Sequence, residues 1–401
     1  MTKDLPTSSK PAHQRLASLD AYRGFIMIAL VSGFFAVGEW TNGTRFETFF
    51  DYQLSHAAWT GCTIWDLIQP SFMFIVGVAM PYSYASRKAK GDSDLKLFLH
   101  ALKRAIILIL LGVFLRSNRS EMTYWTFEDV ISQIGLGYIF VYFTLGHGFK
   151  VQAMVTGGIL VGYCLLFALW PLPAAGYTPF PGGNVDWQYF EGFSAHWNKG
   201  ANPMGYFDQW FLNLFPRATE WGFHTGGYGT LSFIPSMATI LFGVMTGEFL
   251  RGDLPIKKKC MKIAGTGVLF LMIGMLLDGS IWPGANWDWS IAPIVKRIWT
   301  PSFAIFSTGW VLLLLSVFIL IVDVLGFKKW AFPFFVVGMN PLTIYCMESL
   351  LVPWIKHTYH IHFNSISADL ANNHILIEVL VIMTLWGILF WMYRRKIFIR
   401  I

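Results

Sequence analysis

The sequence has few charged side chains for its length. Only 13% of its 401 residues are Asp, Glu, Lys or Arg, whereas 55% are hydrophobic and 17% aromatic. So little polar surface cannot cover a soluble globule of this size, and the composition therefore predicts an integral membrane protein. The apolar stretches have the length of spanning helices, while a transmembrane β-barrel would show short alternating segments. We therefore expect an all-α polytopic helical bundle.

Cysteines and familiar catalytic motifs are also scarce. The four cysteines show no C-x-x-C or metal spacing, so we expect free thiols and no metal site. Walker, G-x-G-x-x-G, H-E-x-x-H and G-x-S-x-G patterns are missing, which removes support for nucleotide hydrolysis and the familiar hydrolases. The polar segment 1–20 lacks the apolar core of a signal peptide, so the first span should direct insertion itself.

Apolar runs predict about ten membrane spans. They lie near 21–39, 64–86, 101–116, 128–146, 151–170, 231–250, 260–278, 303–325, 331–352 and 374–393. An even number of spans leaves both termini on the same side of the membrane. The runs extend along the whole chain, so we expect one transmembrane domain over 21–401.

The distribution of Lys and Arg predicts the orientation. With both termini in the cytoplasm, 22 of the 30 basic residues lie in inside segments, as the positive-inside rule requires. The N-terminal segment 1–20 is then cytoplasmic, and a long aromatic-rich loop at about 171–229 is extracytoplasmic. The net charge of +7 is explained by basic residues near anionic headgroups, so it does not indicate nucleic-acid binding.

Two ionisable residues flank a glycine at the start of the second predicted span. His56 and Asp66 are ten residues apart, and an unbroken helix would separate them by about 15 Å. Direct contact therefore requires a chain break, for which Thr60-Gly61 offers a place. Alternatively, His56 bonds to loop backbone, and Asp66 caps the helix or pairs with a basic residue such as Arg23.

Other polar residues at membrane depth are candidates for a binding site. Gln133 lies in the fourth span, and Asn340 and Glu348 lie on roughly the same face of the ninth. Such groups usually face a bundle interior or a wet cavity, although helix-to-helix hydrogen bonds explain them equally well. A basic group near the predicted cytoplasmic mouth either fixes topology or binds the phosphates of a cofactor. It comprises Arg87, Lys88, His100, Lys103 and Arg104.

Several blocks of sequence resemble the heparan-α-glucosaminide N-acetyltransferase family of transmembrane acyltransferases, in particular its compact bacterial members. The blocks are "RLASLDAYRG" at 15–24, "HAAWTGCTIWDLIQPSFMFIVGVAMPYS" at 56–83, "VISQIGLGYIF" at 130–140, "KRIWTPSFAIFSTGW" at 296–310 and "VVGMNPLTIY" at 336–345. The resemblance implies acetyl transfer from cytoplasmic acetyl-CoA to the amine of a terminal glucosamine across the membrane. It also implies a bacterial inner-membrane location and places the family's catalytic histidine on His56.

The sequence departs from the animal members of this family in two places. Their additional amino-terminal luminal region and one of their spans have no counterpart here, which argues against a lysosomal enzyme. An asparagine late in their first core helix falls on Phe34, which leaves the identity of the acceptor open.

A mechanism can be assigned to the candidate residues on this resemblance. His56 would act as general base, or alternatively as a nucleophile through acetyl-imidazole, and Asp66 would orient it. Asn340 and Gln133 are candidate oxyanion donors, and Trp59 and Trp65 would pack against sugar or pantetheine. Glu348 completes the set of possible acceptor contacts.

Two alternatives remain open from the sequence. A secondary transporter for an amino sugar would use His56, Asp66 and Glu348 as proton or substrate sites, although no internal repeat is visible. An acyltransferase that modifies hydroxyls of cell-surface glycans would use the same base. Membrane lipid is an expected partner in every case, and the sequence leaves a homo-oligomer open.

Overall fold

The computed structural model describes residues 16–33, 41–180, 185–279 and 290–399. Within these ranges the chain is helical, and an isolated bridge between Gly61 and Val295 is the one β-type pairing. The expected all-α class is confirmed. The four cysteines are free thiols. Residues 1–15 of the expected N-terminal segment 1–20 lie outside the described residues. So do residues 34–39 of the first predicted span, which include Phe34.

The helices follow the predicted spans closely. Those of the first half are α1 (Ala17–Ser32), α3 (Glu47–Gln53), α4 (Ile68–Ala89), α5 (Asp94–Ser117), α6 (Val130–Tyr142), α7 (Gly148–Ala168) and α8 (Pro203–Phe211). Those of the second half are α9 (Phe233–Arg251), α10 (Ile256–Asp278), α11 (Pro301–Phe318), α12 (Phe332–Gly338), α13 (Pro341–Leu350), α14 (Val352–Asn364), α15 (Ala368–Ala371) and α16 (His374–Arg394).

Fewer of these helices than predicted are long and apolar enough to cross a membrane. Within the described residues six qualify, namely α5, α7, α9, α10, α11 and α16. The pair α12 and α13 makes a seventh if it is counted as one span, although it bends by 70°. The ten predicted spans are therefore not confirmed.

The other three predicted spans do form helices, but each falls short for a local reason. The described part of α1 has 16 residues and α6 has 13. Helix α4 has 22 residues, but polar residues and prolines, among them Gln69, Pro70 and Pro81, interrupt its apolar character. Hydropathy along the sequence therefore predicted where these helices lie, but not their lengths.

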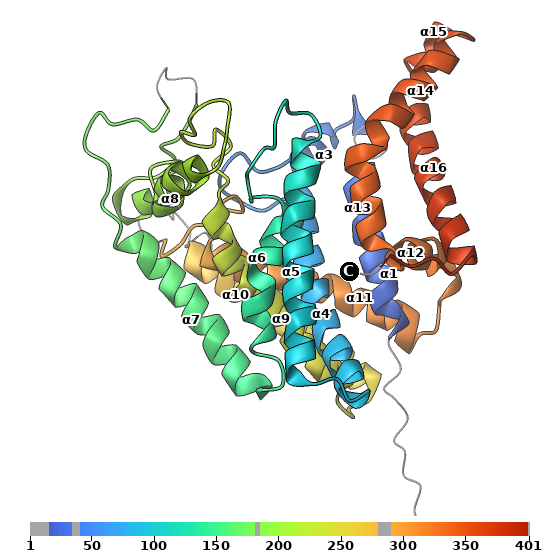
Figure 1. Cartoon of the computed structure of the whole chain (residues 1–401), viewed down its shortest axis with the longest axis horizontal. Helices are drawn as coiled ribbons and strands as arrows, with labels where there is room; N and C mark the ends of the chain where they lie inside the picture. Colours follow the sequence, from blue (N-terminus) through green and yellow to red (C-terminus); the bar gives the residue numbers. More distant parts are fainter. Residues whose placement is uncertain (1–15, 34–40, 181–184, 280–289, 400–401) are drawn as a thin grey trace, which may run out of the picture.

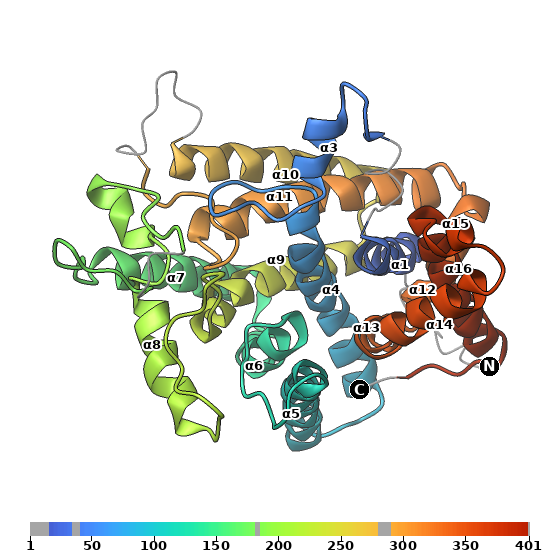
Figure 2. The ribbon, with the colours of Figure 1, turned by 90° about the horizontal axis from the view of Figure 1, so that it is seen from above.

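Close packing around α4 holds the bundle together. In Figure 2, α4 and α9 lie between the α5–α6 pair and the α10–α11 pair. Helices α4 and α9 approach so closely that a Cβ at Gly77 would collide with the Ile240 carbonyl oxygen, and one at Gly243 with that of Phe74. Small residues at helix crossings permit this approach, which is how helices associate where lipid removes the hydrophobic driving force.

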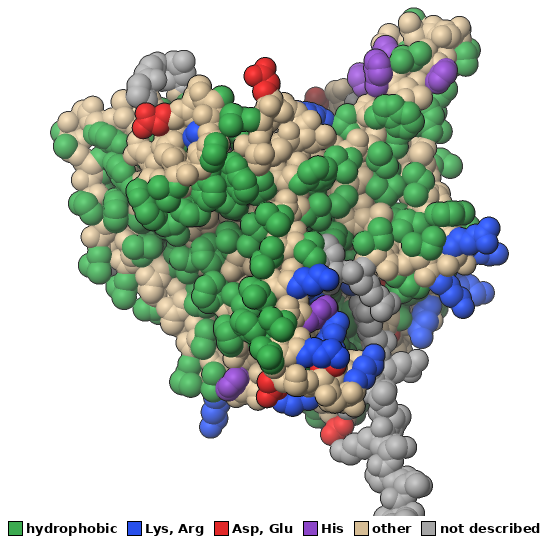
Figure 3. Space-filling view, in the orientation of Figure 1, with side chains coloured by type: hydrophobic (Ala, Val, Ile, Leu, Met, Phe, Trp, Pro, Cys, Tyr) green, Lys and Arg blue, Asp and Glu red, His purple; other side chains and the backbone are tan. Residues whose placement is uncertain are grey.

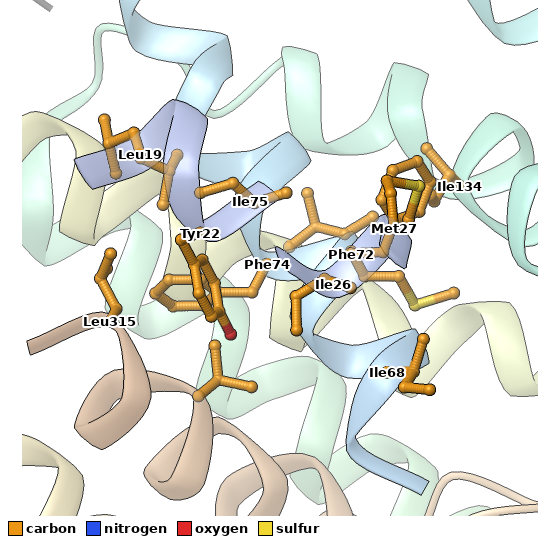
Figure 4. Close-up of a cluster of buried hydrophobic side chains, with 14 of the residues drawn as sticks. Leu19, Tyr22, Ile26, Met27, Ile68, Phe72, Phe74, Ile75, Ile134 and Leu315 are labelled. Carbon is orange, nitrogen blue, oxygen red and sulfur yellow. The ribbon is translucent and has the colours of Figure 1, made fainter. Parts of the chain in front are cut away.

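The main core fixes the N-terminal end of α4. Figure 4 shows Tyr22, Ile26 and Met27 of α1 packed with Ile68 and Phe72 of α4. These side chains are between 0% and 7% exposed, so this end of α4 is held firmly against α1. The loop that contains His56 leads directly into this anchored end.

A cap of aromatic residues covers one end of the bundle. In the described part of segment 171–229, Trp197 and Met204 pack with Trp59 and with Phe167 of α7 in a second core cluster. Figure 1 shows this segment, with α8, at the same end of the bundle as α3. We call this the capped end.

The opposite end is basic. It contains the last turn of α4 and the first turns of α5 and α10, with Arg87, Lys88 and Lys257–Lys259. Figure 3 shows Lys and Arg side chains gathered toward it. We call this the basic end, and the positive-inside rule would place it in the cytoplasm.

Candidate active site

The loop between α3 and α4 reverses direction at Gly61. Its φ is +101°, a conformation that L side chains rarely adopt, and its N–H donates to the Ile294 carbonyl at 2.8 Å. A short helical turn, η1 (Trp65–Leu67), then carries Asp66 into α4. The chain break expected at Thr60-Gly61 is therefore present.

Alanine at Gly61 should disturb this turn. We expect Gly61→Ala to lower the free energy of unfolding by about 1–3 kcal/mol, because the backbone is strained for an L residue. The added Cβ would also lie 3.1 Å from the Tyr52 hydroxyl. Thermal unfolding of the detergent-solubilised protein measures the effect.

Gly157→Ala is the matched control. No atom lies within 4 Å of a Cβ at Gly157, which is inside α7, and alanine favours helix. This variant should be neutral or slightly stabilised. Equal unfolding temperatures for the two variants would contradict a special role for the Gly61 turn.

The turn brings His56 and Asp66 into direct contact. His56 Nδ1 lies 2.7 Å from Asp66 Oδ1. The other carboxylate oxygen accepts from the N–H groups of Ala57 and Thr63, each at 3.2 Å, and from the Thr63 hydroxyl at 3.1 Å. Asp66 is 1% exposed, so a fully bonded, buried carboxylate orients the imidazole ring.

A third ionisable group, Lys296, completes the cluster. Its Nζ lies 3.2 Å from Asp66 Oδ1 and 3.1 Å from His56 Nδ1, and the side chain is 8% exposed. Arg23, the partner suggested for Asp66 from the sequence, instead pairs with Asp20. Asp66 therefore pairs with a basic residue, as one alternative expected, but that residue is Lys296, 230 residues further along the chain, and not Arg23.

The segment before α11 positions Lys296. Thr300 caps α11 by accepting the Phe303 N–H at 3.3 Å, and its hydroxyl also accepts the Val295 N–H at 3.0 Å. Ile294 in the same segment donates its N–H to Asp278 at 2.6 Å and receives the N–H of Gly61. The segment therefore fixes both the Gly61 turn and the lysine beside it.

Opposing effects set the charges of the cluster. Burial raises the pKa of Asp66, but the His56 hydrogen bond, the Lys296 charge and the N–H groups of Ala57 and Thr63 outweigh it and lower that pKa to about 2. Burial lowers the pKa of Lys296, and the nearby Asp66 carboxylate opposes this decrease. Asp66 is consequently a carboxylate throughout the physiological pH range.

The contacts of the imidazole assign its tautomer. Trp65 donates its indole N–H to His56 Nε2 at 3.2 Å, which requires a lone pair on that nitrogen. The ring proton then lies on Nδ1, pointing at Asp66, and Lys296 pairs with the carboxylate rather than the ring. The His56 side chain is 40% exposed, and this tautomer leaves on Nε2 the lone pair that a general base uses.

His56 opens into a small cavity of about 150 Å³. Apolar side chains from four helices form most of its wall, including Leu30, Phe72, Val130 and Tyr345. Trp65 and Lys296 line it beside the imidazole. An apolar pocket with a few converging polar groups is the usual form of a small-molecule site.

Three matches to known sequences include the His56 loop. A domain of unknown function, DUF5009, matches residues 15–174, which include His56 and Asp66. Heparan-alpha-glucosaminide N-acetyltransferase of Mus musculus is 23% identical over 433 residues, covering 99% of this chain and 62% of the relative. The Homo sapiens protein of that name is 23% identical over 429 residues, covering 96% of this chain and 60% of the relative. The chain is distantly similar to these heparan-alpha-glucosaminide N-acetyltransferases along nearly its whole length. It spans about three fifths of the length of these two relatives.

Some of the predicted substrate contacts lie near His56 and others do not. Trp65 contacts His56 directly. Glu348 lies one turn after Tyr345; Tyr345 lines the His56 cavity, and Glu348 does not. Trp59 is 1% exposed and donates to the Trp197 carbonyl at 3.1 Å, so it supports the cap rather than facing the cavity.

The two amides predicted as oxyanion donors are used elsewhere. Gln133 donates from Nε2 to Ser232 at 2.6 Å, and so joins α6 to the turn before α9. Asn340 donates to the Ile397 carbonyl and accepts from the Ile399 N–H, each at 3.0 Å. Both side chains fasten helices or the C-terminal segment, and neither lines the His56 cavity.

The predicted cofactor-binding residues lie together at the basic end. Arg87 pairs with Asp92 at 3.5 Å, Lys88 with Asp94 at 3.4 Å, and Arg104 donates to the Tyr138 hydroxyl at 3.3 Å. His100 interacts electrostatically with Arg87, Lys103 and Arg104. Most of these side chains already have protein partners.

A cavity of about 400 Å³ at the basic end includes Lys88 in its wall. Glu248 and Arg251, which sequence reasoning missed, also line it. It reaches Pro81 of α4, nine residues or about 14 Å of helix beyond Phe72, where the His56 cavity ends. Buried residues of α4, among them Phe74, Ile75 and Val78, occupy the stretch between these two points.

Proposed function

We propose that this chain is a transmembrane acetyltransferase that moves an acetyl group from cytoplasmic acetyl-CoA to the amine of a glucosamine-type sugar on the other side of the membrane. The observation that carries the proposal is the His56–Asp66 pair, with His56 in the wall of a cavity, in a chain distantly similar to known N-acetyltransferases. On this proposal the capped end is extracytoplasmic and the protein lies in a bacterial inner membrane.

His56 acts as general base in this mechanism. The amine nitrogen attacks the thioester carbonyl carbon, and Nε2 takes the proton that the amine loses. The C–S bond breaks, the thiolate of the donor leaves, and the imidazolium returns its proton to it. Trp65 releases its hydrogen bond to Nε2 before the base acts.

Asp66 and Lys296 support the base without touching substrate. The Asp66 carboxylate holds Nδ1–H and stabilises the imidazolium that forms during the reaction. Lys296 fixes the carboxylate and balances its charge within a buried environment. Neither group has to change its protonation state for one turnover.

The donor enters from the basic end in this proposal. Arg87, Lys88, His100, Lys103 and Arg104, together with Arg251, supply positive charge for the nucleotide phosphates. The thioester must then pass the stretch of α4 around Phe74 and Val78 to approach His56. We therefore propose that side chains in this stretch move when the donor binds.

Acetyl transfer by the purified protein tests the proposal. The detergent-solubilised protein with acetyl-CoA and glucosamine should yield N-acetylglucosamine and free thiol in equal amounts, measured by mass spectrometry and a thiol assay. A transporter would yield no acetylated sugar. Acetylation of a sugar hydroxyl would indicate an O-acyltransferase. A stable acetyl-enzyme that forms without acceptor would show that His56 acts as a nucleophile through acetyl-imidazole and not as a general base.

A further inference from the structure

A second cavity of about 420 Å³ lies beside the His56 cavity, also toward the capped end of the bundle. Its wall comes from the end of α5, the loop that follows it, and α13. Tyr345 lines both cavities, and Asp129 of the second cavity is the chain neighbour of Val130 in the first. The two cavities therefore adjoin at Tyr345.

Two carboxylates in this second cavity have unused hydrogen-bonding capacity. Asp129 caps α6 by accepting the Ser132 N–H on Oδ1 at 3.0 Å. Its Oδ2 is shielded from solvent and has no hydrogen-bond partner in the described chain. Glu348 is half-buried, and within the same described ranges its carboxylate makes no hydrogen bond or ion pair. Buried acceptors without partners are uncommon and call for an explanation.

Guanidinium groups on the same wall supply donors. Arg116 is fixed by Thr126, to which its Nε donates at 2.8 Å, and by an ion pair with Glu128. Arg119 is exposed, and no ion pair of its guanidinium occurs in the part of the chain that the structure describes. The cavity therefore presents both acceptors and donors, with the rings of Tyr124 and Tyr345 beside them.

This combination fits a hydroxyl-rich sugar ring better than an acyl donor. Each sugar hydroxyl both donates and accepts, so it can pair with a carboxylate and a guanidinium together. The phosphates of the donor could pair with Arg119, but they would leave the carboxylates of Asp129 and Glu348 without donors, which sugar hydroxyls supply. The volume lies in the range of small-molecule sites, which is about 300–1,000 Å³.

We infer that this second cavity is the acceptor subsite, in which Asp129 and Glu348 accept hydrogen bonds from the ring hydroxyls of an amino sugar. The amine of the bound sugar points past Tyr345 toward His56 Nε2. This inference rests on the proposed function for the identity of the acceptor, while the assignment of the cavity itself rests on its position and polarity. Asp129 and Glu348 are thus specificity-determining residues on the acceptor side.

Charge-removing variants that keep shape test this inference. Asp129→Asn retains an oxygen that can cap α6, and Glu348→Gln keeps the side-chain size. In each variant we expect the KM for glucosamine to rise at least tenfold, while the KM for acetyl-CoA stays within twofold. Glu191→Gln is the matched control, because Glu191 is an exposed carboxylate of the cap that lines neither cavity, and it should change neither constant.

Binding measured without the donor separates this inference from the proposed function. Radiolabelled glucosamine should bind the detergent-solubilised wild-type protein and lose at least tenfold in affinity in both variants. Three results would overturn the subsite. The variants would bind glucosamine as the wild type does, the variants would change only the KM for acetyl-CoA, or the wild type would fail to bind glucosamine. Transfer with an unchanged sugar KM would leave the proposed function intact, whereas sugar binding without any transfer would leave only the subsite.

Discussion

Replacing His56 by alanine should lower the rate of acetyl transfer by about 10²–10⁴-fold, the usual contribution of a positioned general base. Acetyl-CoA binding should be retained, because the donor contacts proposed at the basic end lie beyond the buried stretch of α4. The measurement is kcat with saturating acetyl-CoA and glucosamine, alongside equilibrium binding of labelled acetyl-CoA.

His360→Ala is the control for that variant. His360 is exposed on α14, away from the cavity that contains His56, and its removal should leave kcat unchanged. Full activity of His56→Ala would reject the assigned base. A loss of acetyl-CoA binding equal to the loss of rate would assign His56 to donor binding instead.

The buried charges beside His56 should behave as one unit. Asp66→Asn leaves the Lys296 ammonium, 8% exposed, without its counter-charge, and removal of one partner from a buried pair costs about 3–5 kcal/mol. The double variant Asp66→Asn with Lys296→Met should recover part of that stability. Both proteins should remain poor catalysts, because Nδ1–H has lost the carboxylate that orients it. Thermal unfolding and kcat of the two single variants and the double variant complete the cycle.

An exposed ion pair provides the control for this cycle. Lys356 and Glu378 pair across α14 and α16 with 41% and 23% side-chain exposure, so their coupling should be below about 1 kcal/mol. Additive stability losses at Asp66 and Lys296 would show that the two groups do not interact as the structure indicates.

The pH dependence of this effect follows from the lowered pKa of Asp66. The folded-state pKa of about 2 lies below the ordinary value of about 3.9, so the ionised form stabilises the fold. That contribution is complete above about pH 4 and is lost as the pH falls through 2. Titration of Asp66 itself should therefore add nothing to the stability difference between wild type and Asp66→Asn from pH 5 to 8, as measured by thermal unfolding. A change in that range would report the buried Lys296 ammonium, which has lost its counter-charge. Activity changes in that range should not come from Asp66.

The polar residues predicted to lie at membrane depth have different roles in the structure. His56 and Asp66 were found because they are close in sequence, and the glycine between them signalled the turn that joins them. Gln133 and Asn340 are also polar residues at predicted membrane depth. However, Gln133 hydrogen-bonds Ser232, and Asn340 hydrogen-bonds the C-terminal segment. A polar side chain at membrane depth requires partners, but its residue type does not say whether those partners are protein or substrate.

Composition and local spacing determined the helical class and the approximate position of each helix, because hydropathy depends on neighbours in the chain. They marked Thr60-Gly61 as a place where the chain could break, but left the His56–Asp66 contact open. Only the tertiary structure placed Lys296 against Asp66, enclosed the cavity between Phe72, Val130 and Tyr345, and set Asp129 beside it. These contacts join segments up to 289 positions apart, counted from His56 to Tyr345. They depend on which helix faces pack together, and the spacing of residues along the chain does not predict that packing.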